Sequence, residues 1–232
     1  LGHKAAKLMK RAKVTEARQQ AAIAEKKTLL RNVDEADGLK LHPLAWSKSG
    51  PLGRAEGLSL SYGGRTVCAG LTFTLRPGER MAVTGPNGCG KSTLLKKLCG
   101  QDVAACGTLA LGAGLIVSYV PQDASFLHGG ARDYARNAGV DETMFLTLLR
   151  KLGFERVQFE KDMADYSAGQ KKKVLLARSL CESAHLYLWD EPLNYIDVLS
   201  RMQIEQLLLD YRPTMLFVEH DAAFVRRAAT GT

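Results

Sequence analysis

Gly85-Pro86-Asn87-Gly88-Cys89-Gly90-Lys91-Ser92 is the stretch that decides the fold, because it fits the pattern GxxxxGK(S/T). It lies between a short apolar run, Arg80–Thr84, and a stretch at 91–99 with the composition of a helix. Glycines let successive backbone N–H groups turn toward phosphates, and the start of the helix adds partial positive charge. In such a loop Lys91 can reach the β- and γ-phosphates of a nucleotide, and Ser92 can ligate Mg²⁺. The sequence therefore predicts a phosphate-binding loop between a strand and a helix.

A second apolar run, Leu186–Trp189, ends in two carboxylates, Asp190 and Glu191. At the end of a strand, Asp190 can hold Mg²⁺ through water, and Glu191 is placed to orient or deprotonate an attacking water. Taken alone, the segment would be read as two acids that only cap a strand. Its occurrence together with the glycine loop favours the catalytic interpretation.

The rest of the chain alternates strand-like and helix-like segments. Leu71–Leu75 alternates with period two, whereas Met215–Val218 and Leu186–Trp189 are continuous apolar runs, which are typical of parallel strands covered on both faces. Another apolar run covers 115–120, and a mostly helical section covers about 130–160. This alternation predicts a three-layer α/β core with an antiparallel β portion before the glycine loop.

Tyr166-Ser167-Ala168-Gly169-Gln170 precedes the acidic strand and opens a helix. Here the sequence resembles the ABC ATPase family, whose signature is LSGGQ. The match departs at Tyr166 and Ala168 and keeps Ser167, Gly169 and Gln170. In that family the signature of one domain closes over the nucleotide of a partner domain, so the resemblance implies that this segment acts in trans.

Three further positions are similar to the family pattern. Gln122 follows an apolar strand and resembles the Q-loop glutamine, and His220 resembles the switch histidine that contacts the γ-phosphate. Tyr62 resembles the aromatic residue that stacks on adenine, with an ordinary strand tyrosine as the alternative. The resemblance covers about residues 56–228. It implies a P-loop NTPase of ABC type with a small helical subdomain.

The resemblance also implies a Mg-ATP hydrolase that needs a partner ABC domain for full activity. Its cofactors would be ATP and Mg²⁺, and its catalytic residues Glu191, His220 and Gln122. The residues expected to contact the nucleotide are Tyr62, Gly85, Pro86, Asn87, Gly88, Cys89, Gly90, Lys91, Ser92, Thr93 and Asp190. Those expected to hold the metal are Ser92, Gln122 and Asp190, and those expected to act on a partner's nucleotide are Ser167, Ala168, Gly169 and Gln170.

The subtype depends on Asn194-Tyr195-Ile196-Asp197, which occupies the D-loop position of the family. Transporters usually have a SALD-like sequence there. The ABC-F class, proteins with two ATPase halves joined by a long helical arm, usually has TNHLD. The chain looks most like the antibiotic-resistance group of that class, which implies the C-terminal ATPase half of a factor that acts on the ribosome. The alternative is the nucleotide-binding subunit of a membrane transporter, although the helical section before Ser167 is short for one.

The net charge of +8 is concentrated at the start of the chain, where residues 1–31 hold nine Lys and Arg against two Glu. Residues 3–32 lack Gly and Pro and are rich in helix formers, which predicts an exposed basic helix. This helix could be a solvated face, or it could contact phosphates of rRNA or tRNA, which its poor internal neutralisation favours. The expected domains are a basic arm over 1–33, a connecting linker over 34–55 and an ABC ATP-binding domain over 56–232.

The composition, with 46% hydrophobic and 24% charged residues, is typical of a soluble globular protein. No apolar run reaches the roughly 18–20 residues of a membrane helix, and the basic N-terminus has no signal-peptide core. We therefore expect a cytoplasmic protein without a membrane partner. Because the chain starts without Met inside a helix-like stretch, we expect a piece of a longer protein whose other ABC domain is absent here.

Two further groups of side chains have a simple structural interpretation. The five cysteines (Cys68, Cys89, Cys99, Cys106 and Cys181) form no CxxC pair, which predicts reduced thiols mostly in the core. For Cys89, sensitivity to oxidation beside the phosphates is the alternative. The run Lys171–Lys173 is typical of a solvated helix face.

Overall fold

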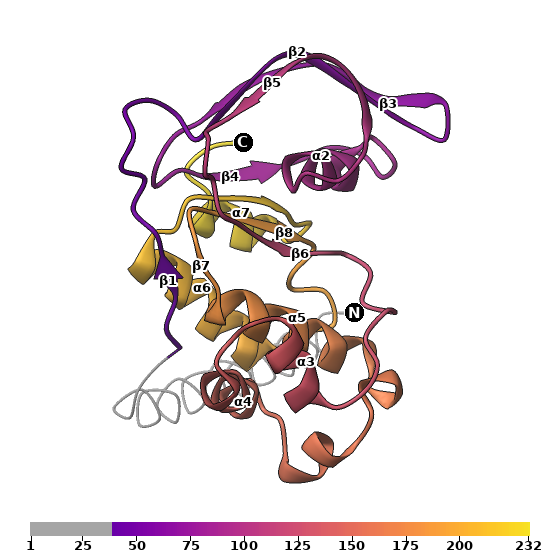
Figure 1. Ribbon diagram of the computed structural model, residues 1–232, viewed down its shortest axis with the longest axis vertical. Coiled ribbons are helices and arrows are strands. Elements are labelled where there is room, and N and C mark those ends of the chain that lie inside the picture. The colour runs from indigo at the N-terminus through magenta and orange to yellow at the C-terminus, as the bar shows by residue number, and fades with distance from the viewer. Residues whose placement is uncertain (1–38) are drawn as a thin grey trace, which may run out of the picture. The chain divides into compact units, whose positions relative to one another are not determined.

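The computed structural model describes residues 39–232, which form one compact unit. The basic arm expected over 1–33 and the first part of the expected linker lie outside the described residues. A four-stranded parallel sheet and a three-stranded antiparallel sheet organise the described part of the chain (Figure 1).

The parallel sheet places the glycine loop and the acidic strand side by side. Its strands lie in the order β4 (Arg80–Val83), β9 (Met215–Val218), β8 (Leu186–Asp190) and β6 (Val117–Val120). The prediction of covered parallel strands is confirmed, because β8 and β9 are buried along their whole length. Alternate residues face different cores, with Leu188 on one side of the sheet and Trp189 on the other. Since the strands are parallel, their carboxyl ends meet at one edge, where both motifs begin.

The antiparallel sheet covers one face of this arrangement. Its strands lie in the order β3 (Arg65–Leu75), β2 (Gly53–Tyr62) and β5 (Ala104–Leu111). Helix α2 (Lys91–Leu98) lies between the two sheets, and buried leucines from all three layers, such as Leu58, Leu95 and Leu188, form one core (Figure 1). The antiparallel portion expected before the glycine loop is therefore confirmed, and β5 adds a strand that comes after the loop.

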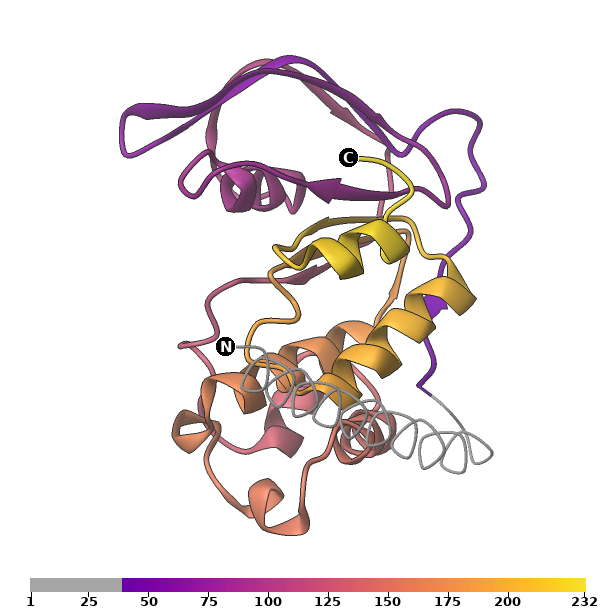
Figure 2. The same cartoon turned by 180° about the vertical axis from the view of Figure 1, so that it is seen from behind.

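Helices cover the other face of the parallel sheet (Figures 1 and 2). They are α5 (Ala168–Cys181), α6 (Val198–Tyr211) and α7 (Ala222–Ala228). Buried residues of all three, such as Val174, Ile204 and Phe224, belong to one core with Trp189 and Phe217 of the sheet. The predicted three-layer α/β core is confirmed, whereas no pattern in the sequence predicts α6.

The section at about 130–160 is mostly helical, as predicted. It contains α3 (Ala131–Asn137), α4 (Glu142–Lys151) and the short 3-10 helices η1 (Arg156–Glu160) and η2 (Met163–Asp165). Asp141 begins α4 by accepting a hydrogen bond from the backbone N–H of Met144 at 2.6 Å, as an N-cap residue does. Phe145 and Leu149 bury the inner face of α4 in the core shared with α5. Within residues 39–232, no helix has both the length and the apolar character that crossing a membrane requires.

The segment that leads into the antiparallel sheet is packed on the domain. Strand β1 (His42–Pro43) pairs in parallel with β7 (Ser183–Ala184), and the side chain of Leu41 is buried. The ring of Trp46 lies edge-on to His185 with 5.3 Å between centroids. It also passes so close to Gly112 that a Cβ there would lie 2.4 Å from it. Only glycine fits at position 112 beneath this ring.

The cysteines are all free, but the expectation that most lie in the core is wrong. Cys106 is exposed, and the other four are only partly buried. Burial, together with the nearby Cys89 thiol, raises the pKa of Cys68. The apolar cores are filled by leucines and aromatic residues instead.

Candidate nucleotide site

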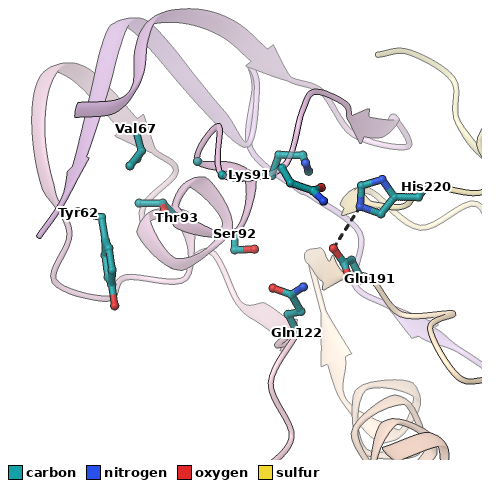
Figure 3. A pocket seen from close by; sticks show the side chains of 11 residues that line it. Tyr62, Val67, Lys91, Ser92, Thr93, Gln122, Glu191 and His220 are labelled. Carbon is teal, nitrogen blue, oxygen red and sulfur yellow. Dashed lines mark hydrogen bonds and ion pairs between the residues drawn. The ribbon is translucent and has the colours of Figure 1, made fainter. Parts of the chain in front are cut away.

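A cavity of about 610 Å³ opens at the edge where the parallel strands end. It is lined by Tyr62, Val67, Asn87, Gly88, Gly90, Lys91, Ser92, Thr93, Gln122, Glu191 and His220. Apart from Val67, every one of these residues was predicted from the sequence as a nucleotide or catalytic residue. Tyr62 lies at one end of the cavity, and Glu191 and His220 lie at the other (Figure 3). The cavity thus has an aromatic ring at one end and ionisable side chains at the other, which suits a ligand with a ring and a charged group.

The glycine loop has the backbone geometry that its sequence predicts. Gly85, Gly88 and Gly90 have φ values of 145°, 80° and 92°, in a region that other residues rarely adopt. The loop runs directly into the N-terminus of α2. The first N–H groups of that helix have no partner within the helix and are available to a ligand in the cavity. Nζ of Lys91 donates to the carbonyl oxygens of Gly85 at 2.8 Å and Pro86 at 3.0 Å. An anion entering the loop therefore finds an ammonium already held above it.

Asp190 provides an internal test of whether a cation belongs at this site. Its side chain is fully buried, and neither carboxylate oxygen has a hydrogen-bond partner. Burial raises the pKa of Asp190; the Ser92 hydroxyl, near but without normal hydrogen-bond geometry, lowers it. An unpartnered buried carboxylate is costly, and Mg²⁺ with its waters would supply the missing charge and donors. The oxygens of Asp190 and Ser92 therefore fit Mg²⁺.

Glu191 is aimed into the cavity by a strained turn. Its φ is 49°, a left-handed conformation that costs energy for any residue except glycine. Its carboxylate accepts from the side-chain amide of Asn194, and from Nε2 of His220 at 3.2 Å in the tautomer that carries the proton there (Figure 3). Sequence reasoning used Asn194 only as a subtype marker, and the structure makes it a direct partner of Glu191. A carboxylate fixed in this way can polarise a water molecule.

The predicted signature lies outside this cavity. Ser167 and Gln170 form a capping box at the start of α5: the hydroxyl of Ser167 accepts from the Gln170 N–H at 3.2 Å, and the Gln170 side chain accepts from the Ser167 N–H at 2.9 Å. A Cβ on Gly169 would lie 2.4 Å from the carbonyl oxygen of Tyr195, so this position requires glycine. Ala168 lines a neighbouring cavity of about 420 Å³, which shares Gln122 and Glu191 with the first one. The signature residues thus lie outside the cavity that the chain's own phosphate-binding loop lines.

Tyr62 ends β2 and is 68% exposed, so one face of its ring is free at the mouth of the cavity. Val67 lies beside it on β3 and adds apolar surface at the same end. No sequence pattern singles out Val67, because a valine in a strand is ordinary. The adenine-stacking role of Tyr62 stays a prediction.

The expected solvated lysine run is wrong for two of its three residues. Lys172 is 3% exposed and donates to three backbone carbonyls beside the cavity. The Lys173 side chain is 14% exposed, forms an ion pair with Asp197 at 2.6 Å and donates to the carbonyl of Leu152. Each ammonium is buried because segments distant in sequence supply its acceptors.

The pair of Lys173 and Asp197 predicts a pH dependence of stability. Burial acts to raise the pKa of Asp197, but hydrogen bonds from Lys173 and Ser200 hold it at about 2, below the ordinary 3.8. A carboxyl whose pKa is lower in the folded state stabilises the fold above its unfolded pKa and loses this effect as the pH falls. Because the Asp197 side chain is 49% exposed, solvent screening reduces the stabilisation to about 1 kcal/mol.

The matched variant is Asp197→Asn, since asparagine keeps the cap on α6, where Asp197 accepts from the Ser200 N–H at 2.9 Å. In urea unfolding, wild type is expected to exceed the variant in free energy of unfolding by about 1 kcal/mol near neutral pH. The difference should shrink as the pH falls from about 5 to about 2. A difference that stays constant over this range would show that the charge of Asp197 is not what stabilises the fold.

Comparison with known proteins gives the family. The sequence model of the ABC transporter family matches residues 68–194. The chain is 32% identical to the ATP-binding protein Uup of Caulobacter vibrioides, over 77% of the chain and 31% of that protein. It is 30% identical to the ribosome protection protein VmlR of Bacillus subtilis, over 74% of the chain and 32% of that protein. Identity to the zinc import ATP-binding protein ZnuC of Ruegeria pomeroyi is 35%, over 77% of the chain and 73% of that protein.

Among solved structures, an archaeal ribosome recycling factor, aABCE1, in complex with a ribosomal stalk protein matches with a TM-score of 0.62 and 25% identity. The match covers 80% of this chain and 37% of the other. The chain spans about a third of the length of the first curated relatives it matches. These relatives agree on the ATPase domain while differing in what the whole proteins do. The cavity, the buried carboxylate of Asp190 whose oxygens have no hydrogen-bond partner, and these matches together place the chain in the ABC transporter family, as an ATP-binding domain that uses ATP and Mg²⁺.

Proposed function

We propose that this chain is the C-terminal ATPase half of an ABC-F protein that acts on the ribosome, as a translation factor or in ribosomal protection. The observation that carries the proposal is the similarity to VmlR, a ribosome protection protein, over 74% of the chain. The D-loop sequence at 194–197 supports the same class. Pairing with a second ABC domain, which is typical of the family, would complete the two nucleotide sites.

The packed segment before the antiparallel sheet supports a working connection to an arm. Through β1 and β7, residues 39–52 are joined to the domain by strand pairing and by the buried side chains of Leu41 and Leu52. An element attached N-terminal to this segment would be pulled by the ATPase domain when the domain moves. A freely hinged linker would transmit no such movement.

In the proposed mechanism, each residue of the cavity has one task. The loop N–H groups and Lys91 would bind the phosphates, and Ser92, Asp190 and Gln122 would hold the metal. Bound Mg²⁺ supplies positive charge that offsets the charge developing on the phosphate oxygens. Glu191 orients and deprotonates the attacking water, and His220 contacts the γ-phosphate and keeps Glu191 in place.

The signature would serve the partner's nucleotide. The Ser167 hydroxyl oxygen accepts from the Gln170 N–H through one lone pair, and its proton is still available to donate to another group. The start of α5 adds partial positive charge in the same direction. A phosphate presented by a facing domain would meet both.

A transporter subunit is the second candidate, and one observation favours it. ZnuC is 35% identical, and the match covers 73% of that protein, more than for Uup or VmlR. The two candidates differ in what the protein with both ABC domains binds. Sedimentation with ribosomes supports the ABC-F proposal, and recovery with membranes supports the transporter.

The predicted basic arm allows a quantitative test of the ribosomal proposal, through the salt dependence of ribosome binding. If residues 3–32 contact RNA phosphates, reversing Lys10, Arg11 and Lys13 to glutamate should weaken ribosome binding and flatten its salt dependence. Each lost phosphate contact removes about 0.7–0.9 from the slope of log affinity against log salt, so the slope should fall by about two to three. The measurement is a ribosome co-sedimentation series over ionic strength.

A matched control changes the same charge on the ATPase domain, through glutamate at the exposed positions Arg65, Arg156 and Lys161. This control is expected to leave the slope closer to that of wild type. An unaltered slope in the arm variant would favour the alternative interpretation, in which residues 3–32 form a solvated face without RNA contacts. An equal reduction of the salt slope in both variants would indicate that the net charge of the protein, and not a contact of the arm, determines the salt dependence of binding.

A further inference from the structure

Lys172 is a buried cation with an unusual set of partners. Its Nζ donates to the carbonyl oxygens of Pro121 at 3.0 Å, Gln122 at 3.1 Å and Asp190 at 3.2 Å. Three donors thus meet three acceptors, and all the acceptors belong to the backbone. Within residues 39–232, no carboxylate forms an ion pair with Lys172 at 4.0 Å or less. The ammonium is therefore held by dipoles and not by a salt bridge.

Two of the three carbonyls belong to residues expected at the metal end of the cavity, Gln122 and Asp190, and the third belongs to the residue before Gln122. Pro121 and Gln122 follow β6, and Asp190 ends the neighbouring strand β8. The side chain of Gln122 lines the cavity, and that of Asp190 carries two unpartnered oxygens. One ammonium therefore fixes the backbone from which both side chains project.

Lys172 also ties this backbone to the signature helix. It lies in the first turns of α5, the helix that Ser167 and Gln170 begin. Burial lowers the pKa of Lys172, while Asp190, Glu191, Glu219 and Asp123 oppose that shift. Keeping a lysine here costs desolvation that an apolar residue would avoid, so a stabilising role alone does not explain it.

We propose that Lys172 is a positioning residue that holds Gln122 and Asp190 in the arrangement that binds the metal of Mg-ATP, and that links this arrangement to the signature helix. The proposal rests on the metal-binding roles proposed above for Gln122 and Asp190. It does not depend on whether the protein acts on the ribosome. The hydrogen bonds that Lys172 donates go to Pro121, Gln122 and Asp190 and not to the glycine loop, so its loss should affect metal-dependent binding and spare the phosphate cradle.

The test compares ATP affinity with Mg²⁺ and with a chelator, by calorimetry on this chain. Lys172→Met is expected to lower the Mg²⁺-dependent gain in affinity about 10–100-fold, the range for loss of groups that orient metal ligands. Its affinity in chelator should match wild type. Lys172→Arg, which keeps charge and donors, is expected to recover most of the gain.

Lys173→Met is the matched control, because Lys173 is the next residue of α5, is also largely buried and contacts no cavity residue. It is expected to lose thermal stability and keep the full Mg²⁺-dependent gain. A second readout needs no ligand: hydrogen exchange of the backbone amides of residues 122–124 in the nucleotide-free chain should accelerate in Lys172→Met and not in Lys173→Met. If Lys172→Met does not fold, Lys172→Gln, a shorter neutral donor, replaces it and is expected to lose an intermediate part of the gain.

Asp190→Asn distinguishes a failure of the proposed metal site from a failure of the positioning role of Lys172. If Asp190→Asn keeps the Mg²⁺-dependent gain, the proposed metal site itself is wrong. If Asp190→Asn loses the gain while Lys172→Met or Lys172→Gln keeps it and only melts earlier, the positioning role is overturned and Lys172 is merely structural. Loss of the gain in both, with recovery in Lys172→Arg, supports the proposal.

Discussion

Changing Glu191 to glutamine is expected to lower the rate of ATP hydrolysis about 10²–10⁴-fold, the contribution of a positioned general base, while ATP stays bound. Glutamine cannot take a proton from water, so the chemical step loses its acceptor. The glycine loop, Lys91 and Asp190 are untouched by the change. The substitution also removes one negative charge near the phosphates, so the affinity for ATP should stay the same or rise.

The local geometry makes this substitution a clean one. Glu191 has a strained φ of 49°, and its carboxylate is fixed by Asn194 and His220, contacts that an amide of the same shape can keep in part. The left-handed turn is unchanged because the side chain keeps its length. The expected loss therefore reports proton transfer and not a collapse of the site.

Single-turnover hydrolysis and calorimetric ATP binding, in the protein with both ABC domains, give the two quantities. Glu205→Gln is a control that removes the same charge, since Glu205 of α6 forms its ion pair with Arg227 of α7 at 2.9 Å and neither residue lines the cavity. Wild-type turnover in Glu191→Gln would remove Glu191 from the catalytic role. Under the proposed ribosomal function, the ATP-bound variant is also expected to remain on the ribosome and inhibit translation.

The features that sequence predicted well are those whose chemistry is local. The positive φ angles of the glycine loop could be predicted from the sequence, because they fall at Gly85, Gly88 and Gly90. The apolar runs that become β8 and β9 are buried on both faces, so each needs no alternation to be recognised. The grouping of Lys91, Glu191 and His220 in one cavity could also be predicted, because each lies just after a parallel strand and parallel strands bring their carboxyl ends to one edge.

The features that sequence missed depend on distant partners. Lys172 lies in a lysine triplet that is typical of solvated helices, and its burial is decided by carbonyls 50 and 18 positions away. Helix α6 keeps Val198 at 67% exposure, so apolar residues stand on its outer side as well and blur the periodicity. Strand β5 is rich in Ala and Gly, residues with little strand preference, and pairs only because β2 provides an edge.

The isolated chain is expected to bind ATP but hydrolyse it slowly, with a specific activity that rises with protein concentration. Ser167 and Gly169 lie outside the chain's own cavity, so ATP held by Lys91 lacks the donors of a facing signature. Each missing preorganised donor costs about 10²–10³ in rate, equivalent to about 2.7–4 kcal/mol. Only transient dimers of the chain would restore those donors. A rate per molecule that is independent of concentration and equals that of the two-domain protein would contradict the shared-site mechanism.

Substitutions at Ser167 then test which nucleotide the signature serves. Ser167→Asp and Ser167→Asn both keep a side-chain oxygen for the cap on the Gln170 N–H, so α5 should remain intact in both. In the two-domain protein, Lys91→Ala first silences the chain's own site, so the remaining hydrolysis reports the partner's nucleotide. Ser167→Asp is expected to lower that hydrolysis at least about 10²-fold, because a carboxylate would face the phosphates in place of a donor. Ser167→Asn, whose amide can still donate, should lose much less. Equal activity in the two variants would mean that Ser167 only caps its helix and that the partner's phosphates are held elsewhere.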